Sequence, residues 1–120
     1  NKKSISQSEK NAEEAKKLAY KFLENAKNDI TNTDLFYISL EKALFNFLKS
    51  RFDFQTTEFS KEKIKLKLSK KNIPDSVIDS LIGILNSCEY ARYTPSSSKE
   101  MKVDYDKAVD VISNIEKSWN

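Results

Sequence analysis

The sequence predicts an all-α fold, a compact bundle of about five helices formed by a single domain. The 120 residues include one glycine and two prolines, too few for the tight turns of an antiparallel β protein. Lys, Glu, Leu and Ala are abundant, and all are good helix formers. Apolar residues recur at steps of three and four along most of the chain. A chain of this length fits one core.

The first helix is expected over residues 9–29, after a polar, lysine-containing segment at 1–8 that we interpret as a flexible tether. Its apolar side consists of Ala12, Ala15, Leu18, Ala19, Phe22, Leu23 and Ala26. The opposite side carries lysine and glutamate, so one side should be buried. Asn32 or Thr33 should cap the next helix.

The second helix is expected over residues 33–51 and is the most apolar part of the chain. Apolar residues cover nearly its whole circumference: Leu35, Phe36, Tyr37, Ile38, Leu40, Ala43, Leu44, Phe45, Phe47 and Leu48. We therefore expect this helix to be central and contacted on several sides. Phe52 and Phe54 should fold inward over its end.

The third segment, residues 60–71, contains conflicting signals. Lysine and apolar residues alternate from Lys63 to Leu68, and a period of two favours a strand. Ser60 followed by Glu62 instead resembles a helix cap with an acidic first turn, and Lys and Leu favour helices. We interpret the segment as a helix.

This interpretation makes a specific prediction about three residues. Ile64 and Leu68 are four positions apart and share one side of a helix, whereas a strand would place Leu66 on the same face as both. We expect Ile64 and Leu68 to face inward and Leu66 to be largely exposed.

The fourth helix is expected over residues 74–92, with Pro74 in its first turn, where proline is tolerated. Its apolar stripe consists of Val77, Ile78, Leu81, Ile82, Leu85 and Cys88. Gly83 lies inside this helix and could allow a neighbouring helix to approach closely.

The fifth helix is expected over residues 97–118, because Ser97 and Glu100 match a capping box. The side chains expected to point one way are Met101, Tyr105, Ala108, Ile112, Ile115 and Trp119. The pattern carries no prediction of the oligomeric state.

The composition argues against an enzyme and against a metal site or cofactor. The chain has no histidine, and Cys88 is its only cysteine, so neither an internal disulfide nor a conventional zinc site can form. The closest carboxylates, Asp104, Asp106 and Asp110, fit a solvated helix face better than a cation site. We expect no catalytic residues, a reducing compartment and a non-catalytic role.

No apolar run approaches the ~18 residues that span a bilayer, so we expect a soluble domain. The chain begins without methionine, which suggests an excerpt of a longer protein. Lys2 and Lys3 in the tether suit contact with an anionic membrane surface. Lys16, Lys17 and Lys21 fit an ordinary solvated helix face.

The strongest charge asymmetry is a lysine cluster. It consists of Lys61, Lys63, Lys65, Lys67, Lys70 and Lys71, offset only by Glu62. A basic nucleic-acid-binding domain with a helix-turn-helix-like unit at 60–92 is the alternative function. The later helix of that unit carries Asp75, Asp79 and Glu89 against Arg92 alone, and phosphates would repel it. A net charge of only +3 also argues against nucleic acid as a partner.

The segment Cys88–Pro95 has a structural interpretation. In this interpretation Cys88 and Ala91 pack inward, Glu89 pairs with Arg92 three residues on, and both tyrosines of the segment cover the edge of the core. A buried free cysteine is usually a small apolar residue, which makes a redox role improbable.

The same segment also has a functional interpretation. Tyr90, Arg92 and Tyr93 could form a partner-docking surface, since Tyr and Arg are enriched at interface hot spots. Lys65 and Lys67 are further candidates, because reversing their charge should weaken association without disturbing the fold.

The helical layout and several short motifs resemble one family, the cytoplasmic C-terminal domain of the BatD oxygen-tolerance proteins of the bacterial inner membrane. The motif residues are Cys88, Glu89, Tyr90, Ala91, Arg92, Tyr93 and Pro95, preceded by Ile73–Asp75, Phe59–Glu62 and Leu40–Leu44. The resemblance covers roughly residues 34–95.

The resemblance implies a non-catalytic adaptor without cofactors on the cytoplasmic face of the inner membrane. The full protein would resemble a periplasmic β-rich region, one transmembrane helix and this domain. Expected partners are proteins of the Bat system with von Willebrand factor A domains and a MoxR-type AAA+ ATPase. The implied context is aerotolerance or envelope stress.

Overall fold

The chain forms five α-helices in a computed structural model that describes residues 7–52, 60–95 and 97–118. The helices are α1 (Gln7–Asn28), α2 (Thr33–Phe52), α3 (Lys61–Lys70), α4 (Asp75–Tyr90) and α5 (Ser98–Ser118). The predicted all-α class is confirmed, and each helix begins and ends within two residues of its expected bounds. Most of the expected tether, together with Phe54 and Trp119, lies outside the described residues.

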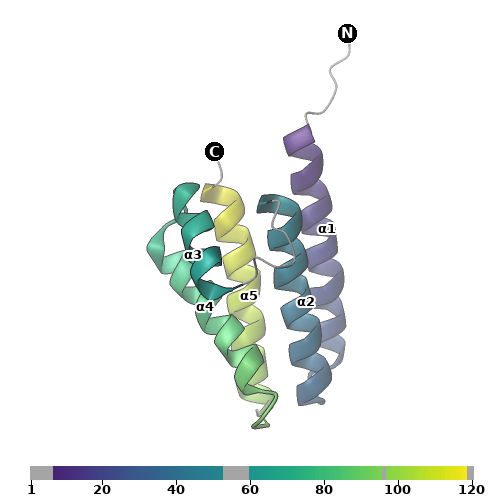
Figure 1. Cartoon of the computed structure of the whole chain (residues 1–120). Coiled ribbons are helices and arrows are strands. Elements are labelled where there is room, and N and C mark those ends of the chain that lie inside the picture. The colour runs from purple at the N-terminus through teal and green to yellow at the C-terminus, as the bar shows by residue number, and fades with distance from the viewer. Residues whose placement is uncertain (1–6, 53–59, 96, 119–120) are drawn as a thin grey trace.

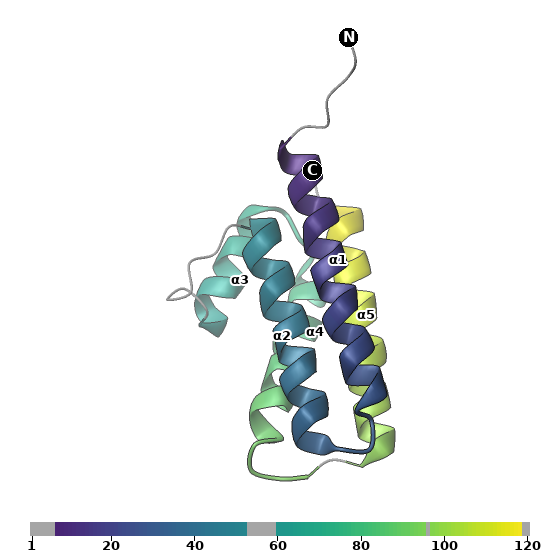
Figure 2. The ribbon, with the colours of Figure 1, turned by 90° about the vertical axis from the view of Figure 1, so that its right-hand side faces the viewer.

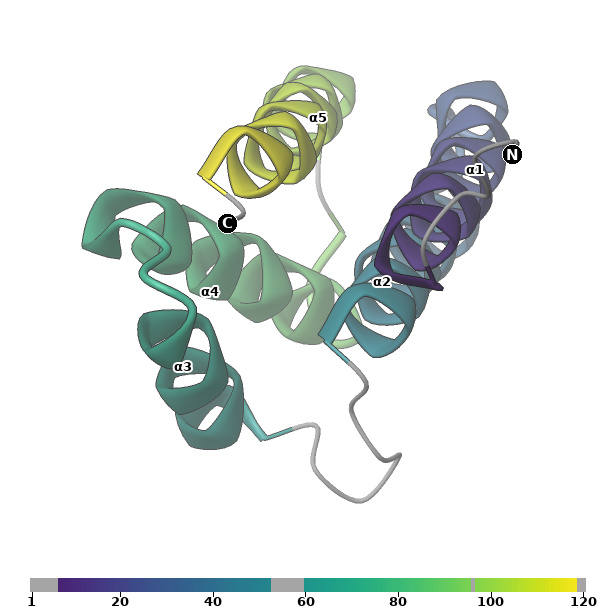
Figure 3. The same ribbon diagram turned by 90° about the horizontal axis from the view of Figure 1, so that it is seen from above.

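The helices α1 and α2 form an antiparallel hairpin, and α5 and α4 pack beside it (Figures 1 and 2). The helix α2 contacts α1, α4 and α5, which confirms its expected central place. Viewed from above, α3 lies at the outer corner of the bundle, packed mainly on α4 and remote from α1 (Figure 3). The α1–α2 turn and the α4–α5 connection lie together at one end of the bundle, which we call the turn end (Figure 2).

The contact between α1 and α2 is built on small residues. Ala15, Ala19 and Ala26 are completely buried on α1, with Leu23 among them. Alanine allows two helix backbones to approach closely. The large buried side chains of α2, which also packs on α4 and α5, are Phe36, Leu40, Leu44, Phe47 and Leu48. Leu18 belongs to the expected apolar side of α1 but is partly exposed.

The helix α2 is not covered all the way round. Leu35 is 48% exposed and Ile38 is 50% exposed, although both belong to the apolar residues of a helix that was expected to be contacted on several sides. The three contacting helices leave one side of the first turns of α2 open. Phe52 at the other end of α2 is buried, as predicted.

The alternating segment is the helix α3, not a strand. Ser60 caps it, accepting a hydrogen bond through Oγ from the backbone N–H of Lys63 at 3.2 Å. Ile64 and Leu68 are buried, whereas Leu66 is 59% exposed, as the helical interpretation predicts. The cap and the helix propensities therefore outweigh the period-two pattern.

A Schellman-type turn ends α3 and aims the chain into α4. Asn72 adopts a left-handed conformation with φ of 63°, which asparagine tolerates better than most residues. Its backbone N–H donates to Ser69 O at 3.0 Å, and that of Ile73 donates to Leu68 O at 3.1 Å. Because Ile73 and Leu68 are both buried, this turn fixes α3 against α4.

Two features of α4 and α5 test further expectations. A Cβ atom added at Gly83 would meet no atom within 4 Å, so the expected close approach of another helix at this glycine is wrong. The capping box of α5 is confirmed: Ser97 N donates to Glu100 Oε1 at 2.8 Å, and Glu100 N donates to Ser97 Oγ at 3.1 Å. Local sequence patterns thus predicted the helix caps correctly, but they did not predict which helices approach each other closely.

Candidate functional site

Large side chains are exposed at the turn end of the bundle. Tyr90 is 61% exposed in the last turn of α4, and Tyr93 is 82% exposed in the connection that follows. The expectation that both tyrosines cover the edge of the core is therefore wrong. Ile38 on α2 and Val103 on α5 are also exposed apolar side chains beside this end.

Tyr90 lines a hollow of about 680 Å³ between α2, α4 and α5. Val103 lines the same hollow from α5. The Tyr37 hydroxyl, also in its lining, donates a hydrogen bond to Asp104 Oδ2 at 2.6 Å, which ties α2 to α5. The hollow thus combines aromatic and apolar side chains with a polar pair whose geometry is fixed.

Two further hollows continue this surface. One of about 310 Å³ is lined by Ile38 and Arg92, and one of about 420 Å³ by Arg92 and Tyr93. Both also include Asp34, and the second shares Pro95 with the hollow at Tyr90. The shared residues make the three hollows one indented surface. We call Ile38, Tyr90, Arg92, Tyr93 and Val103 the turn-end surface.

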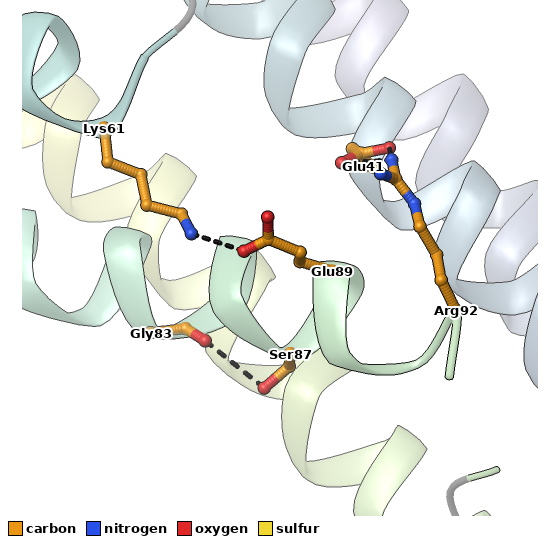
Figure 4. A network of polar contacts seen from close by, with 6 residues as sticks. All are labelled: Glu41, Lys61, Gly83, Ser87, Glu89 and Arg92. Carbon is orange, nitrogen blue, oxygen red and sulfur yellow. Dashed lines mark hydrogen bonds and ion pairs between the residues drawn. The ribbon is translucent and has the colours of Figure 1, made fainter. Parts of the chain in front are cut away.

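Arg92 is held in place by α2. Its guanidinium donates to Glu41 at 3.0 Å and 3.3 Å (Figure 4). Glu89 instead accepts a hydrogen bond from Lys61 Nζ at 2.7 Å, which connects α4 to the start of α3. The expected pair of Glu89 with Arg92 is therefore wrong, because each residue reaches a different neighbouring helix.

The Lys61 ammonium also shifts the titration of its partner. The hydrogen bond and the positive charge of Lys61 lower the pKa of the Glu89 carboxyl. Because the Glu89 side chain is 59% exposed and that of Lys61 36%, solvent screens the pair, and it serves mainly to orient α3 on α4.

Cys88 and Ala91 point inward, as predicted. Burial raises the pKa of the Cys88 thiol well above its usual range, and the nearby carboxylates of Glu41 and Asp104 raise it further. The thiol is therefore protonated at neutral pH, which makes it a poor nucleophile. This cysteine lies beneath the turn-end surface and packs as a small apolar residue.

Lys65 and Lys67 do not lie in the turn-end surface. Both are on α3, and the hollows lined by the two tyrosines within the described ranges include neither lysine. The sequence grouped them with the tyrosines by residue type alone. The two groups belong to separate surfaces of the bundle.

Sequence reasoning missed several residues of this end. Tyr37 and Asp104 lie 67 positions apart, and no local pattern pairs them. The sequence placed Ile38 among the apolar residues of the central helix, and it gave no role to Val103. An apolar residue just outside the buried stripe of a helix can indicate an exposed apolar surface. Val103 is such a residue, since it does not share the spacing of Met101, Ala108 and Ile112.

Within residues 7–52, 60–95 and 97–118, no helix is long and apolar enough to cross a membrane, and nowhere do three potential metal ligands gather. No family model, curated protein or solved structure matches the chain.

Proposed function

We propose that the chain is a non-catalytic protein-interaction domain that docks its partner through the turn-end surface. The observation that carries this proposal is the clustering of two strongly exposed tyrosines, an arginine and exposed aliphatic residues around contiguous hollows. Tyr and Arg dominate the binding energy of protein interfaces, and exposed apolar patches commonly mark interaction sites.

Two polar contacts orient side chains at this surface. Glu41 fixes the guanidinium of Arg92, and the Tyr37–Asp104 hydrogen bond fixes the lining of the hollow beside Tyr90. A partner would therefore pay little conformational entropy to engage these groups. A partner segment with apolar side chains could fill the hollows and contact both tyrosines.

We propose partners from the Bat system or a MoxR-type AAA+ ATPase, at the cytoplasmic face of the bacterial inner membrane. The support is the resemblance to the BatD oxygen-tolerance family. The segment Cys88–Pro95, which contributes most to that resemblance, also supplies both tyrosines and the arginine of the turn-end surface. A role in aerotolerance or envelope stress would follow from such partners.

The test is titration calorimetry of the chain with a purified MoxR-type ATPase and with a purified Bat protein. The double variant Tyr90→Ser with Tyr93→Ser should bind at least about tenfold more weakly, since each tyrosine is a candidate hot spot. Tyr20→Ser on α1 is the matched control, because Tyr20 is exposed but lies outside the turn-end surface. Equal affinity of the double variant and the wild type would refute this surface.

A further inference from the structure

The helix α3 is far more basic than the rest of the chain. With the following Lys71 it carries six lysines and one glutamate, a net charge of +5, whereas the whole chain has a net charge of +3. The remaining residues are together net negative. The net positive charge of the protein therefore comes from one short helix at the outer corner of the bundle (Figure 3).

The exposed side of α3 combines this charge with an apolar residue. Ile64 and Leu68 face the bundle, and at 100° per residue Leu66 points almost directly away from them. Lys63 and Lys70 are exposed and lie three positions before and four after Leu66, so they share its side of the helix. The exposed Glu62, four positions before Leu66, lies on the other flank of the leucine. Leu66 thus stands in solvent beside a pair of lysines, and the side as a whole keeps a net positive charge.

We propose that this outward side of α3 docks onto a bilayer surface that carries anionic lipid headgroups. Lysines near such a surface are attracted to its negative potential, and their flexible stems adapt to a diffuse layer of charge. Leu66 enters the apolar edge of the headgroup region between the lysines. The site is separate from the turn-end surface and does not depend on the function proposed for that surface.

Two other partners fit this side of α3 less well. Lysine is depleted in the cores of protein interfaces, and α3 has no arginine. A nucleic-acid backbone would gain nothing from Leu66. A bilayer accommodates both the charge and the leucine.

The experiment is sedimentation of the 120-residue chain with vesicles of equal parts phosphatidylglycerol and phosphatidylcholine, and with vesicles of phosphatidylcholine alone. The chain should partition onto the anionic vesicles only, and high salt should release it. Lys63→Glu with Lys70→Glu should reduce the partition coefficient at least about twenty-five-fold, because each lysine contributes about fivefold. Lys42→Glu with Lys107→Glu changes the net charge equally at exposed sites elsewhere and should have a much smaller effect.

A second variant separates α3 docking from simple attraction of a basic protein. Leu66→Ser keeps the charge and should reduce partition about fivefold. Circular dichroism should show unchanged helicity for all variants. Equal partition of the α3 variant and its charge-matched control would overturn the proposal. So would failure of the wild type to sediment with anionic vesicles, whether or not it binds a DNA duplex.

Discussion

Replacing Leu66 and Leu68 separately by alanine tests how α3 packs. The two residues have the same chemistry and lie in the same helix, but Leu66 is 59% exposed and Leu68 is completely buried. Leu68→Ala should reduce the free energy of unfolding by about 2–5 kcal/mol, the usual result of removing buried methyl groups and leaving a cavity. Leu66→Ala should change it by no more than about 0.5 kcal/mol.

Urea denaturation followed by circular dichroism measures this difference. With a denaturant slope of about 1–3 kcal/mol per molar, Leu68→Ala should lower the urea midpoint by about 1 M or more, and Leu66→Ala should leave it nearly unchanged. Ile64→Val is an intermediate control, because Ile64 is buried but loses a single methylene, which costs about 0.5–1.5 kcal/mol.

Because α3 packs mainly on α4, part of the loss can appear as local detachment of this helix. Native-state hydrogen exchange of the α3 amides would detect this as faster exchange in Leu68→Ala alone. Equal effects of the two alanine variants in both assays would refute the helical packing, since equal burial of Leu66 and Leu68 is the signature of a strand.

Three further predictions concern polar and reactive groups. The Cys88 thiol should react with a disulfide reagent only at the rate of unfolding, because it is buried and protonated; rapid stoichiometric labelling of the native chain would contradict this. Lys61 lowers the pKa of Glu89, so their ion pair stabilises the fold at pH values above the usual pKa of glutamate and is lost on acidification. The difference in Tm between the wild type and Glu89→Gln should therefore vanish as the pH falls below the usual pKa of glutamate. Glu116→Gln should lower the free energy of unfolding measured in urea by about 1–2 kcal/mol, because Arg51 Nε lies 2.7 Å from Glu116 Oε2 and the Arg51 side chain is almost buried. An unchanged free energy of unfolding would exclude a structural role for this ion pair.

Much of the secondary structure could be predicted because its signals are local. Apolar spacing located α1, α2, α4 and α5, and a serine with an acidic residue within the next three positions marked the starts of α3 and α5. The cap at Ser60 was decisive where the period of two was misleading. The burial of Ile64 and Leu68 followed from this choice.

The relations between helices could not be predicted with the same success. The spacing of Glu89 and Arg92 suits a pair within one helix, yet Lys61 and Glu41 from other helices lie closer to them. Gly83 leaves space that no neighbour fills. A helical pattern defines which side of a helix is apolar, but the packing angle decides which part of that side is covered.

The candidate docking residues also fall into two groups: those that residue type identified and those that only the tertiary structure adds. Residue types singled out Tyr90, Tyr93 and Arg92, but the structure adds Ile38 and Val103, which complete the turn-end surface from two other helices. Lys65 and Lys67 belong with α3 instead. Only the tertiary arrangement distinguishes a docking surface from a collection of suitable residue types.

The alanine seam between α1 and α2 has a consequence for the order of folding. Alanine loses almost no rotamer freedom when it is buried, and the two helices are joined by a short turn, so this hairpin forms at small entropic cost. We expect it to assemble early and to template the docking of α4 and α5. Ala19→Gly should then slow refolding, whereas Ile112→Val on α5 should mainly accelerate unfolding; the reverse pattern in stopped-flow kinetics would place the nucleus elsewhere.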